Sequence, residues 1–240
     1  MACGNSNNID DSLFTRTVSE GAQFDEHASE DSGLDESQGS DDDLLVEDQE
    51  LIENENNDER VSLRSKILQN SNLSENALDN AFEFYERNRS IIRKKDVMTI
   101  FDIGSHSGQR RFYIINLYTG AVSTIHVSHG KNSDKDNDGF ATEFSNTNGS
   151  NQSSLGFMLT AETYYGGNGY SLKLDGLESR NSRVRQRYVV IHGADYVNPN
   201  YSKMGRSYGC PAVSRANNNW VINTIKGGSL LYIYNSRYDG

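Results

Sequence analysis

The 240 residues suffice for one sizeable domain with a tail or for two small domains, and they contain no run of 18 apolar residues that could span a membrane as a helix. The net charge of −11 is concentrated at one end: residues 1–60 hold 19 acidic residues against two arginines, whereas residues 61–240 hold 15 acidic against 21 basic residues. The small and scattered positive excess of the second part argues against nucleic acid as a partner.

Residues 1–60 are predicted to be a disordered acidic tail, because they are too poor in apolar residues to offset the entropy of the chain. They are expected to act either as a tether or as a solubilising tail. Ala2-Cys3-Gly4 resembles the lipidation site of a bacterial lipoprotein, but no charged segment or apolar run precedes it. Either Cys3 carries a lipid that attaches the chain to a membrane, with a signal segment upstream, or it is a chance cysteine of an ordinary N-terminus.

Residues 61–95 predict a helical segment that packs on the domain after it. Glycine and proline are absent from this stretch, and Asn72 and Ser74 are N-cap candidates. Apolar side chains follow at helical spacing, on one face: Leu78, Ala81, Phe82 and Tyr85.

From residue 96 onward the hydrophobic period changes to two, which predicts a mainly β domain over residues 96–240. Strands are expected over residues 97–103, 111–117, 121–128, 156–161, 170–174, 188–192 and 230–234. A short helix is expected over residues 215–225, ending before Gly227-Gly228.

An acidic loop between two of these strands has part of the spacing of a calcium site. Asp134, Asp136, Asp138 and Gly139 match its early positions, but Ser145 stands where such a loop needs a bidentate glutamate. An exposed acidic loop is therefore favoured, and neither a metal nor a cofactor is predicted.

Two strand ends are expected to bring a thiol and an imidazole together. His192 follows the apolar run of residues 188–191, and Cys210 follows a turn bracketed by Gly205 and Gly209. The only other cysteine lies in the acidic tail, so Cys210 is expected to be a free thiol. A histidine within hydrogen-bond reach can convert such a thiol into a thiolate with an imidazolium partner.

These residues predict acyl transfer, with Cys210 as nucleophile and His192 as base. The N–H groups of Tyr208, Gly209 and Cys210 are expected to converge as an oxyanion hole. Residues expected to donate to the oxyanion or to position the reacting groups are Gly193, Ser207, Tyr208 and Gly209. The alternative is a small core cysteine and a structural histidine. One cysteine without a CxxC or HxxxH spacing gives too few ligands for a metal.

The segment His192-Gly193 … Ser207-Tyr208-Gly209-Cys210 resembles the HG and SxGC signature of the L,D-transpeptidase catalytic (YkuD-like) family, and more closely its murein L,D-transpeptidase branch. Seven ordered blocks carry the resemblance across roughly residues 75–235, namely residues 128–133, 144–146, 153–157, 174–178, 192–197, 205–213 and 225–229.

This resemblance implies that residues 96–240 form a catalytic domain, a mixed-sheet β-sandwich with Cys210 and His192 in a groove, in the bacterial cell envelope or periplasm. Cys210 would attack the carbonyl before the terminal D-alanine of a peptidoglycan stem peptide, and the acyl group would pass to the side-chain amine of a diamino acid. With water as acceptor the same site would be an L,D-carboxypeptidase, and without activity the domain would be a peptidoglycan-binding module. Acylation of the cysteine by carbapenems is a further implied trait.

The chain departs from the family at one position near the cysteine. Many members have an arginine two residues after the cysteine, where this chain has Ala212. Arg206 is the candidate replacement as a substrate-binding residue, against the alternative of an exposed surface arginine. His129, which precedes Gly130 at a strand end, is expected to be structural or to contact substrate. The oligomeric state stays open.

Overall fold

The computed structural model describes residues 58–239, and every structural statement below concerns this part of the chain. Cys3 and nearly all of the predicted acidic tail lie outside it. Within residues 58–239, no helix is long and apolar enough to cross a bilayer.

The predicted helical segment forms two helices instead of one, a helix of residues 58–69 and α2 (Glu75–Arg87). Between them, the amide of Asn70 and the hydroxyl of Ser71 donate to carbonyls of the last helical turn, at 2.8 Å each. Such side-chain bonds compete with the helical backbone and favour its end. Ser74 occupies the N-cap of α2, and the predicted apolar face is buried: Leu78, Ala81, Phe82 and Tyr85.

The described part contains nine strands, which include all those predicted. Their bounds are β1 (Val97–Asp102), β2 (Phe112–Asn116), β3 (Val122–Ile125), β4 (Val127–Ser128), β5 (Gly156–Gly166), β6 (Gly169–Gly176), β7 (Val190–Ala194), β8 (Ala212–Ser214) and β9 (Leu230–Tyr234). The remaining elements are the 3-10 turn η1 (Lys131–Ser133), α3 (Arg215–Ile225) and α4 (Ser236–Asp239). The expected helix of residues 215–225 and strand of residues 230–234 are confirmed at their bounds, whereas β8 was not predicted.

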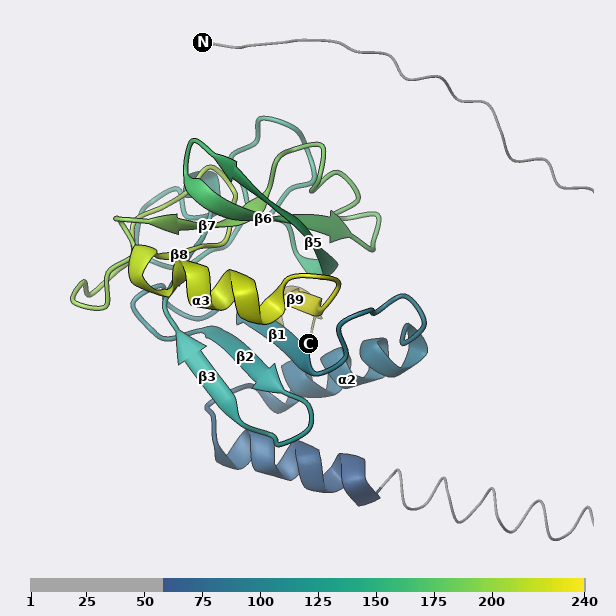
Figure 1. Cartoon of the computed structure of the whole chain (residues 1–240). Helices are drawn as coiled ribbons and strands as arrows, with labels where there is room; N and C mark the ends of the chain where they lie inside the picture. Colours follow the sequence, from purple (N-terminus) through teal and green to yellow (C-terminus); the bar gives the residue numbers. More distant parts are fainter. Residues whose placement is uncertain (1–57, 240) are drawn as a thin grey trace, which may run out of the picture. The chain divides into compact units, whose positions relative to one another are not determined.

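The strands form one mixed sheet in the order β3-β2-β1-β9-β5-β6-β7-β8-β4, with parallel pairs at β1–β9 and β7–β8. Its two edge strands, β3 and β4, are separated in the chain by His126 alone. The sheet therefore curves until its edges nearly meet, so that β5–β8 lie on one side of α3 and β1–β3 on the other (Figure 1). The mainly β, mixed-sheet class is confirmed, with two halves of one nearly closed sheet in place of two separate sheets.

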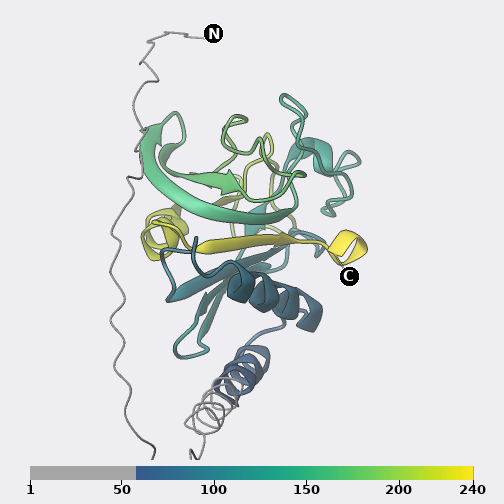
Figure 2. The ribbon, with the colours of Figure 1, turned by 90° about the vertical axis from the view of Figure 1, so that its right-hand side faces the viewer.

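Much of the curvature comes from β5, which bends strongly over β9 (Figure 2). The pairing of β5 with β6 shifts register between Thr160 and Thr163. An extra residue in one strand of an antiparallel pair bends that strand and increases its twist.

The two faces of the sheet bury different clusters of side chains. One cluster includes Phe101, Ile191 and Val213 and is filled by α3, while the other is covered by α2 and includes Met98 and Tyr232. Because Ile191 and Val213 face α3, their neighbours along β7 and β8 face the opposite way. That alternation places the side chain of His192 on the face opposite α3.

Candidate active site

The predicted base lies on β7, and the predicted nucleophile lies two residues before the neighbouring parallel strand β8. His192 is in register with Ala212, on the face opposite α3. Two residues before each of them stand Val190 and Cys210, and the Val190 N–H lies 3.5 Å from Cys210 Sγ. Cys210 therefore lies beside the start of β7, two residues before the first paired residue of β8. The contact with Val190, two residues before His192 on β7, brings the thiol close to the strand that carries the ring.

The turn before Cys210 is held by the hydroxyl of Ser207. This hydroxyl donates to the carbonyl of Cys210 at 2.7 Å and accepts from the Gly209 N–H at 3.0 Å, and the Ser207 N–H donates to the carbonyl of His129 at 2.8 Å. Gly209 has φ of 124°, and a Cβ there would lie 2.8 Å from the carbonyl oxygen of Gln152. Only glycine meets both conditions without strain.

One expected oxyanion donor is already engaged in this turn. The Gly209 N–H donates to Ser207, so it does not converge with its neighbours on a free acceptor position. The expectation of three converging N–H groups is therefore wrong for Gly209. The N–H groups of Tyr208 and Cys210 stay predictions.

His192 is 4% exposed and its tautomer follows from one contact. Its Nδ1 lies 3.2 Å from the carbonyl oxygen of Gly193, and because a carbonyl only accepts, Nδ1 carries the proton. Burial, with a smaller effect of the Arg215 charge, lowers the pKa of His192 below its ordinary value. The ring is neutral near pH 7, with Nε2 free to accept a proton.

Gly193 has a further structural reason to lack a side chain. A Cβ there would lie 3.1 Å from the Asn218 side chain of α3. Helix α3 thus packs closely behind the strand that carries His192.

The thiol of Cys210 is also neutral in the free protein. Burial raises the pKa of Cys210, and the Val190 N–H and the Arg187 charge act in the opposite direction. Sγ lies 3.6 Å from the carbonyl oxygen of Tyr188, and within residues 58–239 no hydrogen bond joins it to His192. Burial thus disfavours both charges of the expected thiolate–imidazolium pair, which stays a prediction.

His129 lies in a buried chain of polar groups. A guanidinium N–H of Arg111 donates to its Nδ1 at 2.8 Å, so Nε2 carries the proton and donates to Asp134 at 3.2 Å. Burial and the Arg111 charge lower the pKa of His129 to about 3. Its side chain is 1% exposed, which favours the structural alternative, and contact with substrate stays a prediction without a supporting surface.

Arg206 links the segment before Cys210 to the acidic loop. Its Nη1 donates to the carbonyls of Lys131, at 3.3 Å, and Asp134. Nearby, the ammonium of Lys131 lies 4.5 Å from the ring centre of Tyr208. These contacts anchor Arg206 to backbone, and its substrate-binding role stays a prediction.

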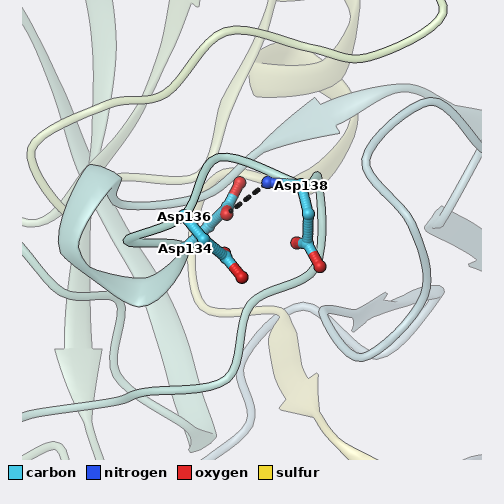
Figure 3. A group of neighbouring side chains, drawn as sticks. All are labelled: Asp134, Asp136 and Asp138. Atoms are coloured by element: carbon cyan, nitrogen blue, oxygen red, sulfur yellow. Dashed lines mark hydrogen bonds between the residues drawn. The ribbon is translucent and has the colours of Figure 1, made fainter.

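The acidic loop brings the carboxylates of Asp134, Asp136 and Asp138 within 4.8 Å of one another (Figure 3). Asp134 is buried and accepts from the N–H groups of Asp138, at 3.0 Å, and Gly139, at 3.1 Å. Asp136 and Asp138 are exposed. The buried Asp134 carboxylate thus links the backbone of its own loop to the ring of His129.

Two residues near Cys210 were not expected from the sequence. Tyr196 packs against the cluster that contains Ala212, and burial raises its pKa to about 12, so the phenol keeps its proton. Arg187 reaches the residue before the cysteine, since a Cβ on Gly209 would lie 3.6 Å from its Nη2. The sequence offered no signal for Arg187, because arginines alternate at positions 183, 185 and 187 and only the folded turn directs one of them inward.

The fold and the site define a mainly β domain with a buried histidine on β7 and a cysteine two residues before the adjacent parallel strand β8. Residues 69–234 match the L,D-transpeptidase catalytic domain (YkuD_2) family, and the chain belongs to this family. A comparison with curated proteins finds no match.

Several solved structures are similar to this chain at low sequence identity. An L,D-transpeptidase from Mycobacterium smegmatis is 15% identical with a TM-score of 0.38, and the match covers 58% of each chain. L,D-transpeptidase 1 of Mycobacterium tuberculosis is 14% identical with a TM-score of 0.34, covering 58% of this chain and 61% of that one. An L,D-transpeptidase from Xylanimonas cellulosilytica is 16% identical with a TM-score of 0.33, covering 59% and 62%. The chain thus spans about six tenths of their lengths.

Proposed function

We propose that this chain is an L,D-transpeptidase that transfers acyl groups between peptidoglycan stem peptides in the bacterial cell envelope. Family membership supports the reaction class and the substrate class. The observation that supports the proposal is the contact of the Cys210 thiol with the N–H of Val190, two residues before the neutral His192 ring on β7. A neutral base with a free nitrogen is the form that can accept a thiol proton.

In the first half-reaction, Cys210 attacks the carbonyl carbon before the terminal D-alanine of a donor stem. Its proton passes to Nε2 of His192, and a tetrahedral oxyanion forms. The carbon–nitrogen bond then breaks, the departing amine takes the proton back from His192, and a thioester to Cys210 remains. The N–H groups of Tyr208 and Cys210 are the candidate donors to the oxyanion.

In the second half-reaction, the side-chain amine of a diamino acid on a neighbouring stem attacks the thioester. His192 accepts a proton from the amine and returns it to the leaving sulfur, so that the new amide is a cross-link and Cys210 is again a thiol. Water in place of the amine would release a shortened stem peptide, which is the L,D-carboxypeptidase alternative.

The covalent step can be tested without knowing the natural donor. We expect the full chain to form a carbapenem adduct that is visible by intact mass, that Cys210→Ala abolishes and that Cys3→Ser retains. Absence of the adduct, together with a Cys210 that alkylating reagents do not modify at neutral pH, would contradict the proposal and favour a peptidoglycan-binding module.

The acceptor is identified from products. Purified sacculi are incubated with the protein, and the muropeptides are separated after digestion. New cross-linked dimers support transfer, whereas tripeptides alone would show that water is the acceptor.

Attachment to a membrane through a lipid at Cys3 stays a prediction, because Cys3 lies outside the described residues. Mass spectrometry of this residue in protein taken from native membranes decides it. An unmodified thiol would exclude lipid attachment at this position.

A further inference from the structure

Arg187 is a half-buried cation whose partners are all neutral. Its Nη1 donates to the carbonyl of Ser145 and the hydroxyl of Ser154, and its Nη2 donates to the hydroxyl of Ser150 and the carbonyl of Gln152, at 2.5 to 3.1 Å. Within residues 58–239, no carboxylate lies within ion-pair distance of it.

Arg185, two residues earlier, shows the usual arrangement for an arginine on this turn. It pairs with the carboxylates of Glu162 and Asp175. Burying a guanidinium among neutral oxygens costs solvation that no local anion offsets. An uncompensated positive charge at Arg187 is thus a feature that packing alone does not require.

The Arg187 guanidinium reaches the backbone next to Cys210. Tyr188 directly follows Arg187, and its carbonyl oxygen is 3.6 Å from Cys210 Sγ. From the other side, a Cβ on Gly209, the residue before Cys210, would lie 3.6 Å from Nη2 of Arg187. The segments that carry Arg187 and Cys210 are therefore in contact at two points, one at Tyr188 and one at Gly209.

The backbone at this point is held in an unusual conformation. Tyr188 has φ of 56° and its side chain is 74% exposed, although tyrosine rarely adopts the left-handed region. Its left-handed conformation ends the turn, with the Tyr188 N–H donating to the carbonyl of Arg185. Strain of this kind persists where the surrounding structure requires one geometry.

We propose that Arg187 is a positioning residue that acts through Cys210, by stabilising its thiolate during the reaction. The inference rests on the proposed function, because it requires Cys210 as nucleophile. It also accounts for the departure at Ala212: the positive charge near the nucleophile is supplied from the turn before β7, a different element from the one that follows the cysteine. The competing role is a purely mechanical clamp on residues 145–154.

The two possible roles of Arg187, stabilisation of the thiolate and a mechanical clamp, predict different pKa values for the thiol. When the thiol loses its proton, the new negative charge on Sγ is attracted to the unpaired guanidinium. An opposite charge within about 4–6 Å typically moves a pKa by about one unit or more. A clamp would leave the pKa of the thiol unchanged and alter only the order of the segment it holds.

The test is the rate of reaction of Cys210 with dithiodipyridine, a neutral disulfide, as a function of pH. It uses the full chain with Cys3→Ser, so that Cys210 is the only thiol. Arg187→Gln keeps a hydrogen-bond donor and removes the charge, while Arg187→Lys keeps the charge. Arg183→Gln, an exposed arginine on the same turn, is the matched control.

We expect Arg187→Gln to raise the midpoint of the pH profile by about one unit. Below that midpoint the rate should fall about threefold, because a tenfold loss of thiolate is partly offset by the greater nucleophilicity of a more basic sulfur. At high pH the same variant should react about threefold faster than the parent protein. Arg187→Lys and Arg183→Gln should keep the original midpoint.

An unchanged midpoint in a folded Arg187→Gln protein would overturn the inference, as would equal shifts in the Gln and Lys variants. If Arg187→Gln does not fold, Arg187→Met is the second variant, because it fills similar space with an uncharged side chain and should also raise the midpoint by about one unit. An unchanged midpoint in a folded Arg187→Met protein would overturn the inference. The carbapenem adduct of the parent protein is a separate measurement, so failure of the proposed function and failure of this inference are distinguishable.

Discussion

At the scale of single residues, burial sets the protonation of the candidate base. The pKa of His192 lies below its ordinary value of 6.5, so the ring remains a competent base until the pH falls below that value. We predict an acid limb of the transfer rate with its midpoint below 6.5, and a loss of about 10²–10⁴-fold in His192→Gln. Carbapenem acylation rates across pH measure both. A midpoint at or above 6.5 would contradict the burial argument.

His129 should make stability depend on pH. Its pKa is about 3 in the folded protein and near 6.5 when unfolded, so the unfolded chain binds the extra proton between these values. The contribution of His129 to the free energy of unfolding is therefore complete above pH 6.5. It is lost as the pH falls towards 3, at about 1.4 kcal/mol per pH unit.

Replacing this ring should flatten the acid dependence. In His129→Gln the free energy of unfolding at pH 7 should drop, because Arg111 and Asp134 lose a buried partner. Between pH 6.5 and 4, its stability should fall less steeply than that of the parent protein. Urea unfolding at several pH values provides the comparison, and parallel curves would show that His129 does not carry the dependence.

At the scale of elements, α2 is fixed to the sheet by a face that the sequence predicts. Leu78 is fully buried in the cluster beneath this helix. We predict that Leu78→Ala lowers the free energy of unfolding by about 2–5 kcal/mol. Glu83→Ala, on the exposed face of the same helix, should change it by less than about 0.5 kcal/mol. Denaturant titration distinguishes the two, and similar losses would mean that α2 is not held by its apolar face.

Elements with their own pattern could be predicted, and those fixed by neighbours could not. Residues 215–225 follow the N-cap residue Ser214 and end before two glycines, and residues 230–234 are an unbroken apolar run. Both elements are found at the expected bounds. The three residues of β8 carry no pattern, and they become a strand because β7 and β4 lie on either side. Tyr188 has high strand propensity, yet it takes a left-handed turn outside β7.

The candidate site likewise has features that the sequence predicts and features that only the fold determines. Cys210 and His192 could be expected from residue type and turn signals in the sequence. The neutral state of both groups, the engagement of the Gly209 N–H and the inward direction of Arg187 depend on burial and on segments far apart in the chain. No single stretch of sequence contains that information.

At the scale of the whole molecule, the folding unit should begin near residue 58. The buried clusters draw on residues from Ile67 onward, and the family match begins at residue 69. We predict that deleting residues 1–57 changes the free energy of unfolding by less than about 0.5 kcal/mol and leaves the reactivity of Cys210 unchanged, since acidic, apolar-poor sequence adds little buried area.

A longer deletion provides the matched comparison. Removing residues 1–74 also removes the helix of residues 58–69, with the fully buried Ile67 and the buried Leu73. Loss of two such side chains from a core should cost at least about 2–5 kcal/mol. Thermal and urea unfolding of the two truncated proteins measure the stability cost of each deletion. A cost above about 1 kcal/mol for the shorter deletion would mean that the acidic segment contributes to the folded domain, and the boundary would then have to move towards the N-terminus.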